Sequence, residues 1–344
     1  MIQLSDRSFG ADATLFTLTN SHGMSVDLTD FGATIVAVRA PDSKGRVKDV
    51  VTGYDNAEGY AQGKACFGCT IGRYGNRIAN GRFAIDGQEY QLVTNNGANH
   101  LHGGNRGFGQ YPWEAQEVQG GVVFSRLSPD GEEGYPGNLD VEVQMTLNDA
   151  NELELLYRGT TDAATHVNLT NHAYFNLAGH SAGSILDHEL WIGAETMVPV
   201  SAALIPDGSF MEVEGTPLDF QRSTRIGDRI DDPHEQMVRA GGYDHCYVIS
   251  GRKGALRHAA TLQEKRSGRF MEVLTTEPGM QFYTGNFLDG SERGKGGAVY
   301  AYRNGLCLET QHYPDTPNQP QFPTTLLRPG EVYSTTTIYR FGAY

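Results

Sequence analysis

Short segments suited to β-strands follow one another along almost the whole chain, with turn residues between them. In the clearest case, Asp86-Gly87 separates the alternating segments Arg82–Ile85 and Glu89–Val93, and this dipeptide suits the two-residue type I′ loop of a hairpin. The 43 glycines recur between segments rich in Val, Thr, Tyr, Phe and Ile, a pattern typical of strands joined by tight turns. Further strands are expected at Val26–Leu28, Thr34–Arg39, Gly121–Leu127, Leu139–Leu147, Glu152–Gly159, Met271–Thr276, Ala298–Tyr302 and Val332–Tyr339.

The sequence therefore predicts an all-β protein. No long amphipathic helix emerges, and Thr224–Ile230 is at most a short one. Pro, Gly and Asn clusters are spread evenly, without a linker, a low-complexity tract or a clear internal repeat. Many short strands in 344 residues are expected to form a single domain, residues 1–344, with two large sheets packed as a β-sandwich. Function would then be carried by polar residues on a sheet face and by loops over it.

The charge of the chain argues against some classes of partner. Lys and Arg total 27 against 41 Asp and Glu, which gives a net charge of -14. Nucleic acid and anionic membrane surfaces are therefore poor partners. Met1–Gly10 holds no apolar run of signal-peptide length, and no later stretch is long enough to span a bilayer. We expect a cytoplasmic protein.

Four cysteines occur, two of them in the run Cys66-Phe67-Gly68-Cys69, with Cys246 and Cys307 isolated. A zinc site would need a second closely spaced pair of ligands, and a thioredoxin-like motif would need a βαβ setting that the sequence lacks. We interpret the cysteines as reduced structural thiols.

The segment Val167–Leu177 is expected to form a strand with two chemically different faces. Apolar side chains alternate onto one face, which can pack on a core, and an imidazole lies among hydrogen-bonding groups on the other. Such groups suit a ligand with many hydroxyls, so we interpret this face as one wall of a sugar site. The polar face comprises Asn168, Thr170, His172, Tyr174 and Asn176, and the apolar face comprises Leu169, Ala173, Phe175 and Leu177.

A second expected strand, Leu306–His312, could supply an acid–base partner for His172. Its leucines share one face, while Glu309 shares the other with Cys307 and Gln311. A carboxylate and an imidazole together provide a base and an acid. Taken singly, His172 is better explained as a buried hydrogen-bonding residue and Glu309 as an edge charge. Their occurrence together in two such strands favours catalysis.

The glycine-rich run Gly72–Gly81 has some features of a phosphate loop. It lacks a Lys-Ser or Lys-Thr ending, and no helix follows to supply a dipole. We expect Asn76 and Arg77 to donate hydrogen bonds to neutral hydroxyls. Either arginine of the run, Arg73 or Arg77, could equally be a structural anchor that pairs with carbonyls or carboxylates.

The segment Asn99–Gly104 places His100 and His102 on the same side of an extended segment, where they could chelate a metal. A metal-binding cupin would place a ligating Glu a few residues later, but the sequence continues Gly103-Gly104-Asn105-Arg106. We therefore predict no metal. His102 is better interpreted as a hydrogen-bond donor to substrate, with a glycine beside it that permits close approach.

Two further segments carry groups that suit vicinal diols. Gly241–His245 is expected to form a turn that projects Asp244, and Glu277–Asn286 combines Gln281 with aromatic residues and glycines. Carboxylates and amides can both bond two neighbouring hydroxyls. Each segment is also ordinary turn or core material, so its position alone does not assign it to a site.

Six motifs together resemble the aldose 1-epimerase (galactose mutarotase) family in order and approximate spacing, and the resemblance spans almost the whole chain. The departures are small: Tyr74-Gly75 stands where Val-Ala is more usual, and His100 where Ser is common. The motifs are Gly72–Gly81, His100–Gly104, Asn171–Leu177, Tyr243–His245, Gln281–Asn286 and Leu308–Asp315.

The resemblance implies a β-supersandwich, no cofactor, and interconversion of the α and β anomers of free aldohexoses such as galactose and glucose. It implies that Glu309 is the general base and His172 the general acid. It also implies substrate-binding roles for Arg77, His102, Asp244 and Gln281, with Asn76 and Tyr174 nearby.

Two other functions stay open from the residues. A non-catalytic carbohydrate-binding protein would also present a polar, aromatic-lined sheet face, although it needs no acid and base such as His172 and Glu309. A metal-dependent sugar isomerase of the cupin type would use His100, His102 and a later Glu or His as ligands. The expected partner is a small aldose, and the sequence does not indicate which aldose is preferred. It is compatible with either a monomer or a homodimer.

Overall fold

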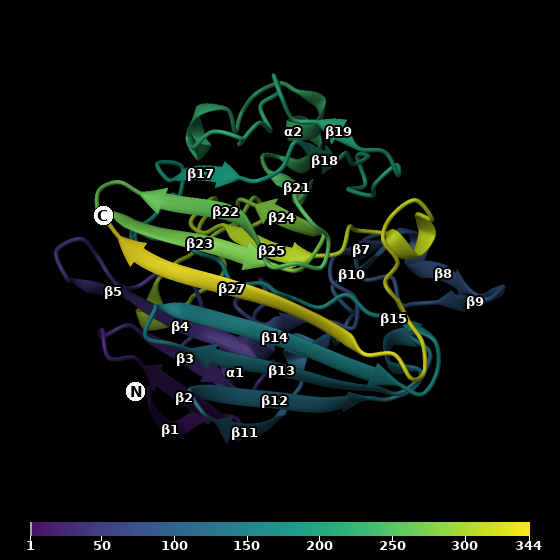
Figure 1. The fold of residues 1–344 in the computed structure, drawn as a ribbon, viewed down its shortest axis with the longest axis horizontal. Coiled ribbons are helices and arrows are strands. Elements are labelled where there is room, and N and C mark those ends of the chain that lie inside the picture. Colours follow the sequence, from purple (N-terminus) through teal and green to yellow (C-terminus); the bar gives the residue numbers. More distant parts are fainter. Residues whose placement is uncertain (1) are drawn as a thin grey trace.

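A computed structural model describes residues 2–344, and β-strands make up most of it (Figure 1). The largest layer is a nine-stranded antiparallel sheet. In sheet order its strands are β11 (Glu114–Val118), β12 (Gly121–Ser128), β13 (Leu139–Leu147), β14 (Glu152–Thr161), β27 (Tyr333–Ala343), β23 (Arg269–Thr275), β22 (Arg257–Glu264), β17 (Glu189–Ile192) and β20 (Thr224–Arg225). Strand β27 follows every other strand in sequence but pairs near the middle of this sheet.

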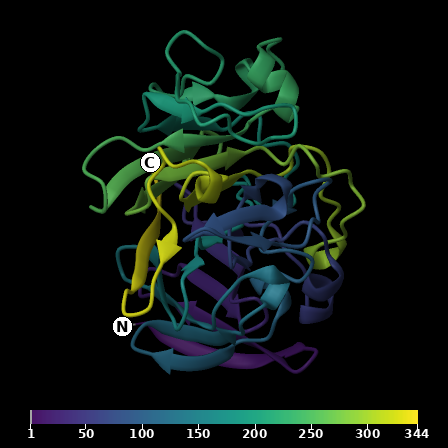
Figure 2. The same cartoon turned by 90° about the vertical axis from the view of Figure 1, so that its right-hand side faces the viewer.

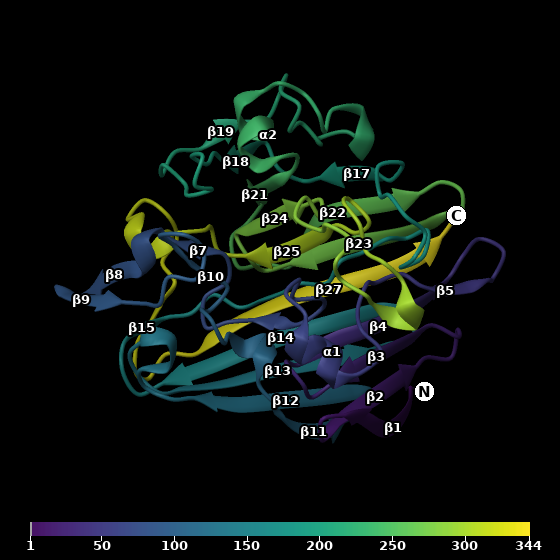
Figure 3. The same cartoon turned by 180° about the vertical axis from the view of Figure 1, so that it is seen from behind.

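Two five-stranded sheets lie behind the nine-stranded sheet in the view of Figure 1, and they face the viewer in Figure 3. The first contains, in order, β1 (Gln3–Gly10), β2 (Ala13–Thr19), β3 (Ser25–Thr29), β4 (Thr34–Pro41) and β5 (Val47–Asp49). The second contains β19 (Met211–Glu212), β18 (Thr196–Val198), β21 (Asp244–Val248), β24 (Gly279–Tyr283) and β25 (Cys307–Gln311). The layers form the large β-sandwich that the sequence predicts.

One main hydrophobic cluster joins the three sheets. It includes Leu18 and Val26 of the first five-stranded sheet, Val143 and Leu155 of the nine-stranded sheet, and Phe282 of the second five-stranded sheet, all fully buried. In β13 every second residue is buried and the residues between are more exposed, because successive side chains of a strand point to opposite faces. The period-two pattern of the sequence thus places the core on one face of the large sheet.

Four short strand pairs, two α-helices and six short 3₁₀ helices complete the part of the chain that the structure describes. The pairs are β7 (Arg77–Ile78) with β10 (His100–Leu101), β8 (Arg82–Ile85) with β9 (Gln88–Gln91), β6 (Thr70–Ile71) with β16 (Thr170–Asn171), and β15 (Thr165–His166) with β26 (Leu326–Leu327). The α-helices are α1 (Ala57–Gln62) and α2 (Glu235–Ala240). The 3₁₀ helices are Ala79–Gly81, Phe108–Gln110, Glu132–Gly134, Ile226–Asp228, Lys295–Gly297 and Thr316–Asn318. Among residues 2–344, no helix has the length and apolar character needed to cross a membrane.

Segments far apart in sequence meet beside the strand pairs. In Figure 2 the blue segments around β7 to β10 lie beside yellow segments from the last part of the chain. The backbone N–H of Ala79 donates to Asp315 Oδ1 at 2.9 Å, and the N–H of Asp315 donates to Arg77 O at 2.8 Å. These contacts hold the glycine-rich run against the segment that follows β25 (Cys307–Gln311).

The sequence located most of the strands. The expected strand Leu139–Leu147 has the bounds of β13, and the Asp86-Gly87 hairpin is confirmed, with φ values of 52° and 84° that suit a type I′ loop. The strand expected at Ala298–Tyr302 is wrong. Val299 makes only an isolated bridge, and the Tyr300 ring is buried 5.2 Å from that of Phe67, so its β-like composition serves packing instead of pairing.

Candidate active site

A cavity of about 310 Å³ opens where widely separated parts of the chain meet. Its walls mix charged, amide and aromatic side chains, as expected for a ligand with both hydroxyls and an apolar surface. Of the residues that the sequence predicts for the site, Asn76, Arg77, His102, His172, Tyr174, Asp244 and Glu309 line this cavity.

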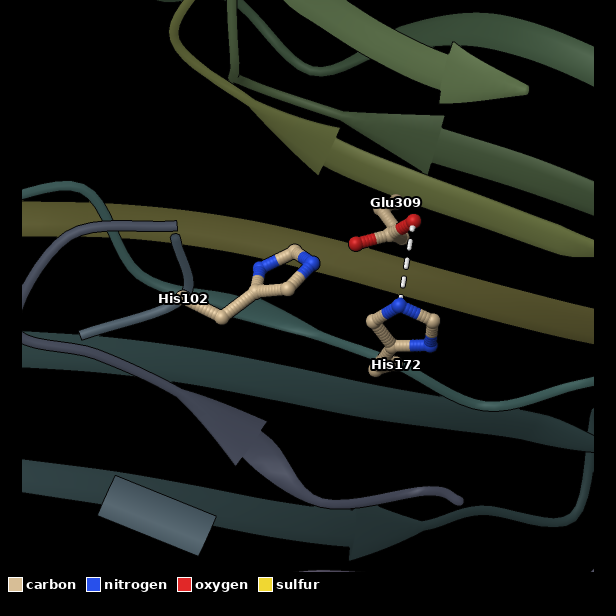
Figure 4. A group of neighbouring side chains, drawn as sticks. All are labelled: His102, His172 and Glu309. Atoms are coloured by element: carbon tan, nitrogen blue, oxygen red, sulfur yellow. Dashed lines mark ion pairs between the residues drawn. The ribbon is translucent and has the colours of Figure 1, made fainter. Parts of the chain in front are cut away.

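His172 and Glu309 form the centre of the cavity, with Nε2 of the imidazole 3.7 Å from Oε1 of the carboxylate. Figure 4 shows both side chains and that of His102 converging from three different segments. The ring of His172 stacks on Tyr174 at 5.0 Å, and its Nδ1 lies 3.5 Å from the Cys307 thiol. These contacts fix the ring and direct Nε2 toward Glu309.

The chain around His172 is irregular and does not form the long strand that the alternation predicts. Only Thr170–Asn171 pairs as a strand, with Thr70–Ile71. The segment before β6 forms hydrogen bonds with both the backbone N–H and the backbone C=O of His172. The N–H of Gly68 donates to His172 O at 2.9 Å, and the N–H of His172 donates to Cys69 O at 3.0 Å.

The apolar face predicted for this segment is confirmed. On the polar face, some side chains line the cavity and others form structural hydrogen bonds. His172 and Tyr174 line the cavity. Asn168 and Asn176 do not, because their buried side-chain amides donate to backbone carbonyls at 3.1 and 2.8 Å. The interpretation of the whole polar face as a sugar wall is therefore wrong for the two asparagines. The confirmed core residues are Leu169, Ala173, Phe175 and Leu177.

Glu309 lies on β25, where the alternation predicted from the sequence is confirmed. Leu306 and Leu308 belong to the main hydrophobic cluster, and Glu309 points to the other side, into the cavity. Only 2 % of Glu309 is exposed. A carboxylate buried to this extent is not an edge charge in solvent.

The two arginines of the glycine-rich run have different environments. Arg73 is 2 % exposed, and its guanidinium donates to backbone carbonyls of Ser128, Pro136 and Gly137 at 3.0, 2.8 and 2.9 Å. It is a structural anchor. Arg77 lines the cavity, and its Nε donates to the side chain of Asn96 at 3.1 Å.

Tyr74 and His100, which depart from the usual family motifs, lie away from the cavity. The Tyr74 hydroxyl accepts from the backbone N–H of Thr316 at 3.2 Å. His100 is fully buried, with Nε2 2.7 Å from the Tyr135 hydroxyl. The expectation that His100 and His102 share one side of an extended segment is wrong, because His102 has a φ of 52° that breaks the alternation.

His102 has a tautomer that can be inferred from its contacts. Its Nδ1 accepts a hydrogen bond from the backbone N–H of Asn76 at 3.2 Å, so the neutral ring carries its proton on Nε2. Ligand atoms of His102, His172 and Glu309 lie within 4.8 Å of one another, which approaches a two-histidine, one-carboxylate metal set. A protonated Nε2 cannot coordinate a metal, so His102 fits a hydrogen-bond donor better than a ligand.

Asp244 and Gln281 act together at one wall. The side-chain amide of Gln281 donates to Asp244 Oδ1 at 2.7 Å, and both residues lie on paired strands, β21 and β24. Asp244 lines the cavity, but Gln281, 3 % exposed, stands behind it. In this structure Gln281 orients the Asp244 carboxylate.

Burial penalises the charged forms of both central groups. It lowers the pKa of His172 to about 4. It raises the pKa of Glu309 well above its ordinary value, with the charges of Asp244 and Cys66 adding to the rise and that of Arg77 opposing it. The imidazolium is therefore a stronger acid, and the carboxylate a stronger base, than either would be in water.

The cavity also has a rim that the sequence analysis did not select. It includes Lys64, Cys66, Glu292, Tyr283 and Phe287. The Tyr283 and Phe287 rings stack at 6.0 Å and 22°, and Phe287 is 66 % exposed. Tyr283 could have been found, because it lies two residues after Gln281 on the same strand face. The other rim residues lie in loops that carry no periodic signal.

Comparison with known proteins agrees with this geometry. The family model described as aldose 1-epimerase matches residues 14–340. Galactose mutarotase from Bos taurus is 47% identical over 336 residues, which cover 98% of this chain and 96% of that protein. Galactose mutarotase from Homo sapiens is 49% identical over 318 residues, which cover 92% of this chain and 91% of that protein.

A bacterial relative and a solved structure extend the likeness. Aldose 1-epimerase from Escherichia coli K12 is 39% identical over 336 residues, with 96% of each protein covered. The crystal structure of an aldose epimerase homologue from C. elegans has a TM-score of 0.88 at 29% identity and covers 100% of this chain and 99% of that one. With a family match over nearly its full length and relatives close to half identical, the chain belongs to the aldose 1-epimerase family of isomerases.

Proposed function

We propose that the protein interconverts the α and β anomers of free aldohexoses, galactose and glucose among them, by opening and closing the sugar ring. The observation that carries this proposal is the buried pair of His172 and Glu309, 3.7 Å apart in a cavity lined by hydrogen-bonding groups. The names of the relatives, galactose mutarotase and aldose 1-epimerase, support the same reaction.

Ring opening needs two proton transfers, and the pair can supply both. Glu309 takes the proton of the anomeric hydroxyl while His172 delivers a proton from Nε2 to the ring oxygen. The C1–O5 bond breaks, the open-chain aldehyde turns about C1–C2, and closure on the other face reverses both transfers. Each positioned transfer contributes ~10² to 10⁴ in rate. Burial penalises the charged form of each group, so an imidazolium at His172 gives up its proton, and a carboxylate at Glu309 takes one up, more readily than in water.

The other polar residues are proposed to hold the sugar. His102 donates from Nε2 to a hydroxyl, and Asn76 lies beside it. Arg77 donates to a second hydroxyl, and Asp244, oriented by Gln281, accepts from one or two more. The ring of Tyr174 packs at the same centre and keeps the ring of His172 in place. None of these roles requires a cofactor.

Polarimetry tests the proposal directly. Freshly dissolved α-D-galactose and α-D-glucose should reach their equilibrium rotation faster with the protein than with buffer, and the two rates give the preference between them. Glu309→Gln serves as the matched inactive control. A protein that binds galactose without accelerating mutarotation would be a lectin, and the proposal would fail.

Three properties of the chain stay predictions. One domain spanning residues 1–344 is supported by the main hydrophobic cluster, which includes residues from Phe16 to Phe341. The cytoplasm is the expected location, and a monomer or a homodimer is the expected assembly. Size-exclusion chromatography with light scattering would distinguish the two assemblies.

A further inference from the structure

The cysteines Cys66 and Cys69 are the ends of one tight turn. The backbone N–H of Cys69 donates to Cys66 O at 3.4 Å, and Gly68, third in the turn, has a φ of 65° that suits a type II turn. The ends of such a turn lie within about 7 Å of each other, and a disulfide joins Cα atoms about 4.4 to 6.8 Å apart. The turn therefore holds the Cα atoms of Cys66 and Cys69 at a separation that a disulfide can span.

The two thiols differ in exposure and in acidity. Cys66 is partly exposed and lines the cavity, whereas Cys69 is 5 % exposed and has its Sγ 3.3 Å from Cys66 O. A hydrogen bond from the Cys69 thiol lowers the pKa of Cys66, and the same contact raises the pKa of Cys69. An accessible, acidified thiol backed by a second thiol is the arrangement of a redox-sensitive pair.

The same turn holds the central histidine. Gly68 N–H donates to His172 O at 2.9 Å, and Cys69 O accepts from His172 N–H at 3.0 Å. The side-chain amide of Asn171 also donates to Gly68 O at 2.7 Å. A change in the turn is therefore passed directly to the backbone of His172.

We propose that Cys66 and Cys69 form a reversible disulfide that lowers the activity of the enzyme. The Cys66 thiolate attacks a low-molecular-weight disulfide such as oxidised glutathione, which releases one thiol and leaves a mixed disulfide. Cys69 then attacks Cys66 Sγ, the intramolecular S–S bond forms, and the second glutathione leaves as a thiol. The protein loses two hydrogens, and one glutathione disulfide becomes two thiols. Disulfides in reducing compartments are typically of this transient kind.

Activity should fall because the new bond moves the cavity wall and the histidine together. Cys66 is drawn back from the cavity toward Cys69, and the turn that bonds His172 changes shape. A displacement of about 1 Å at a catalytic group can cost ~10²-fold in rate, so we expect a loss of about tenfold or more in kcat. This readout rests on the proposed mutarotase function, and the disulfide itself is measured independently.

The experiment compares reduced and oxidised protein. Purified protein is reduced, freed of reductant and treated with oxidised glutathione. Peptide mass mapping should show a link between Cys66 and Cys69, and the number of free thiols should fall from four to two. Polarimetry should show the loss of activity, and dithiothreitol should restore it.

Variants identify which cysteines cause the loss of activity. The activity of each oxidised variant is compared with that of the same variant in its reduced state. Cys69→Ala should trap a mixed disulfide at Cys66, and Cys66→Ala should keep its activity under oxidation. Cys246→Ala, a matched buried cysteine outside the turn, should be oxidised and inactivated like the wild type. The inference is overturned if no Cys66–Cys69 link forms, if the link forms without loss of activity, or if Cys246→Ala is protected. A reduced wild type without mutarotase activity would instead overturn the proposed function.

Discussion

The Nδ1 atom of His102 accepts a hydrogen bond from the backbone N–H of Asn76 at 3.2 Å, and this contact determines what His102 can do. It leaves the ring proton on Nε2, the atom that would have to bind a metal shared with His172 and Glu309. The three side chains resemble a metal site in their spacing, but the tautomer of one of them favours donation to a hydroxyl.

Mutarotase activity should therefore be independent of divalent metal. Overnight dialysis against a strong chelator, followed by polarimetry in metal-free buffer, should leave the rate unchanged. Metal analysis of the same samples is the control. Loss of activity that one particular metal restores would contradict this and would favour a metal-dependent isomerase.

Glu309→Gln should keep sugar binding and lose nearly all catalysis, because the amide preserves the shape of the side chain but has no basic oxygen. His172→Gln should behave similarly, since it removes the proton donor to the ring oxygen. Each should lower kcat by ~10² to 10⁴, measured by polarimetry, with galactose binding measured by calorimetry. Glu272→Gln and His258→Gln make the same changes outside the cavity and should retain activity. Substantial activity in Glu309→Gln would refute the acid–base assignment.

Truncation of Arg77, His102 or Asp244 to alanine should raise KM as well as lower kcat. These side chains are proposed to bond hydroxyls in both the ground state and the transition state. The loss of one such bond is expected to lower kcat/KM by about 10- to 100-fold. Arg82→Ala, on the exposed face of β8, is the matched control for Arg77→Ala. A variant with unchanged KM would show that its residue does not hold the sugar.

The pH profile of kcat/KM should be bell-shaped with an acidic limb at unusually low pH. Burial lowers the pKa of His172 to about 4 and raises that of Glu309 well above 4.5. Between the two values the pair holds one proton, and the pairs in which His172 carries that proton have both the acid and the base that the reaction needs. Below the lower value both groups are protonated and no base remains, and above the higher value no acid remains. An acidic limb near 6.5, the ordinary histidine value, would show that burial does not control the pair.

Arg73→Met should destabilise the fold more than it affects the chemistry. The guanidinium is buried and donates to carbonyls of Ser128, Pro136 and Gly137, which would lose their donors. Each buried group left unpaired costs about 1 to 3 kcal/mol, so the free energy of unfolding should fall by about 3 kcal/mol or more. Urea unfolding followed by tryptophan fluorescence measures this. Arg82→Met, at an exposed position, should have little effect, and equal stability of the two variants would contradict the anchor role.

The sequence predicted the features that depend on local or periodic patterns. The Asp86-Gly87 hairpin depends on two residues whose backbone conformation is local. The position of Glu309 depends on the alternation of β25, whose leucines are drawn into the core. Both follow from residues within a few positions of each other, and both are confirmed.

The sequence could not separate residues whose roles depend on distant parts of the chain. Arg73 and Arg77 belong to one motif, and only the carbonyls near residues 128 to 137 make the first an anchor. Asn168 belongs to the same polar alternation as His172 but bonds a backbone carbonyl. The left-handed φ of His102 likewise has no local signal. In each case the role of the residue depends on contacts with parts of the chain that are distant in sequence.

The placement of β27 in the middle of the large sheet has a consequence for biosynthesis. Its partners β14 and β23 are made much earlier, and they cannot be joined until Tyr333–Ala343 has left the ribosome. Until then each presents an unpaired edge of the kind that promotes association between nascent chains. Expression at lower temperature or with chaperones would protect the chain during that interval, which ends when its last strand closes the sheet.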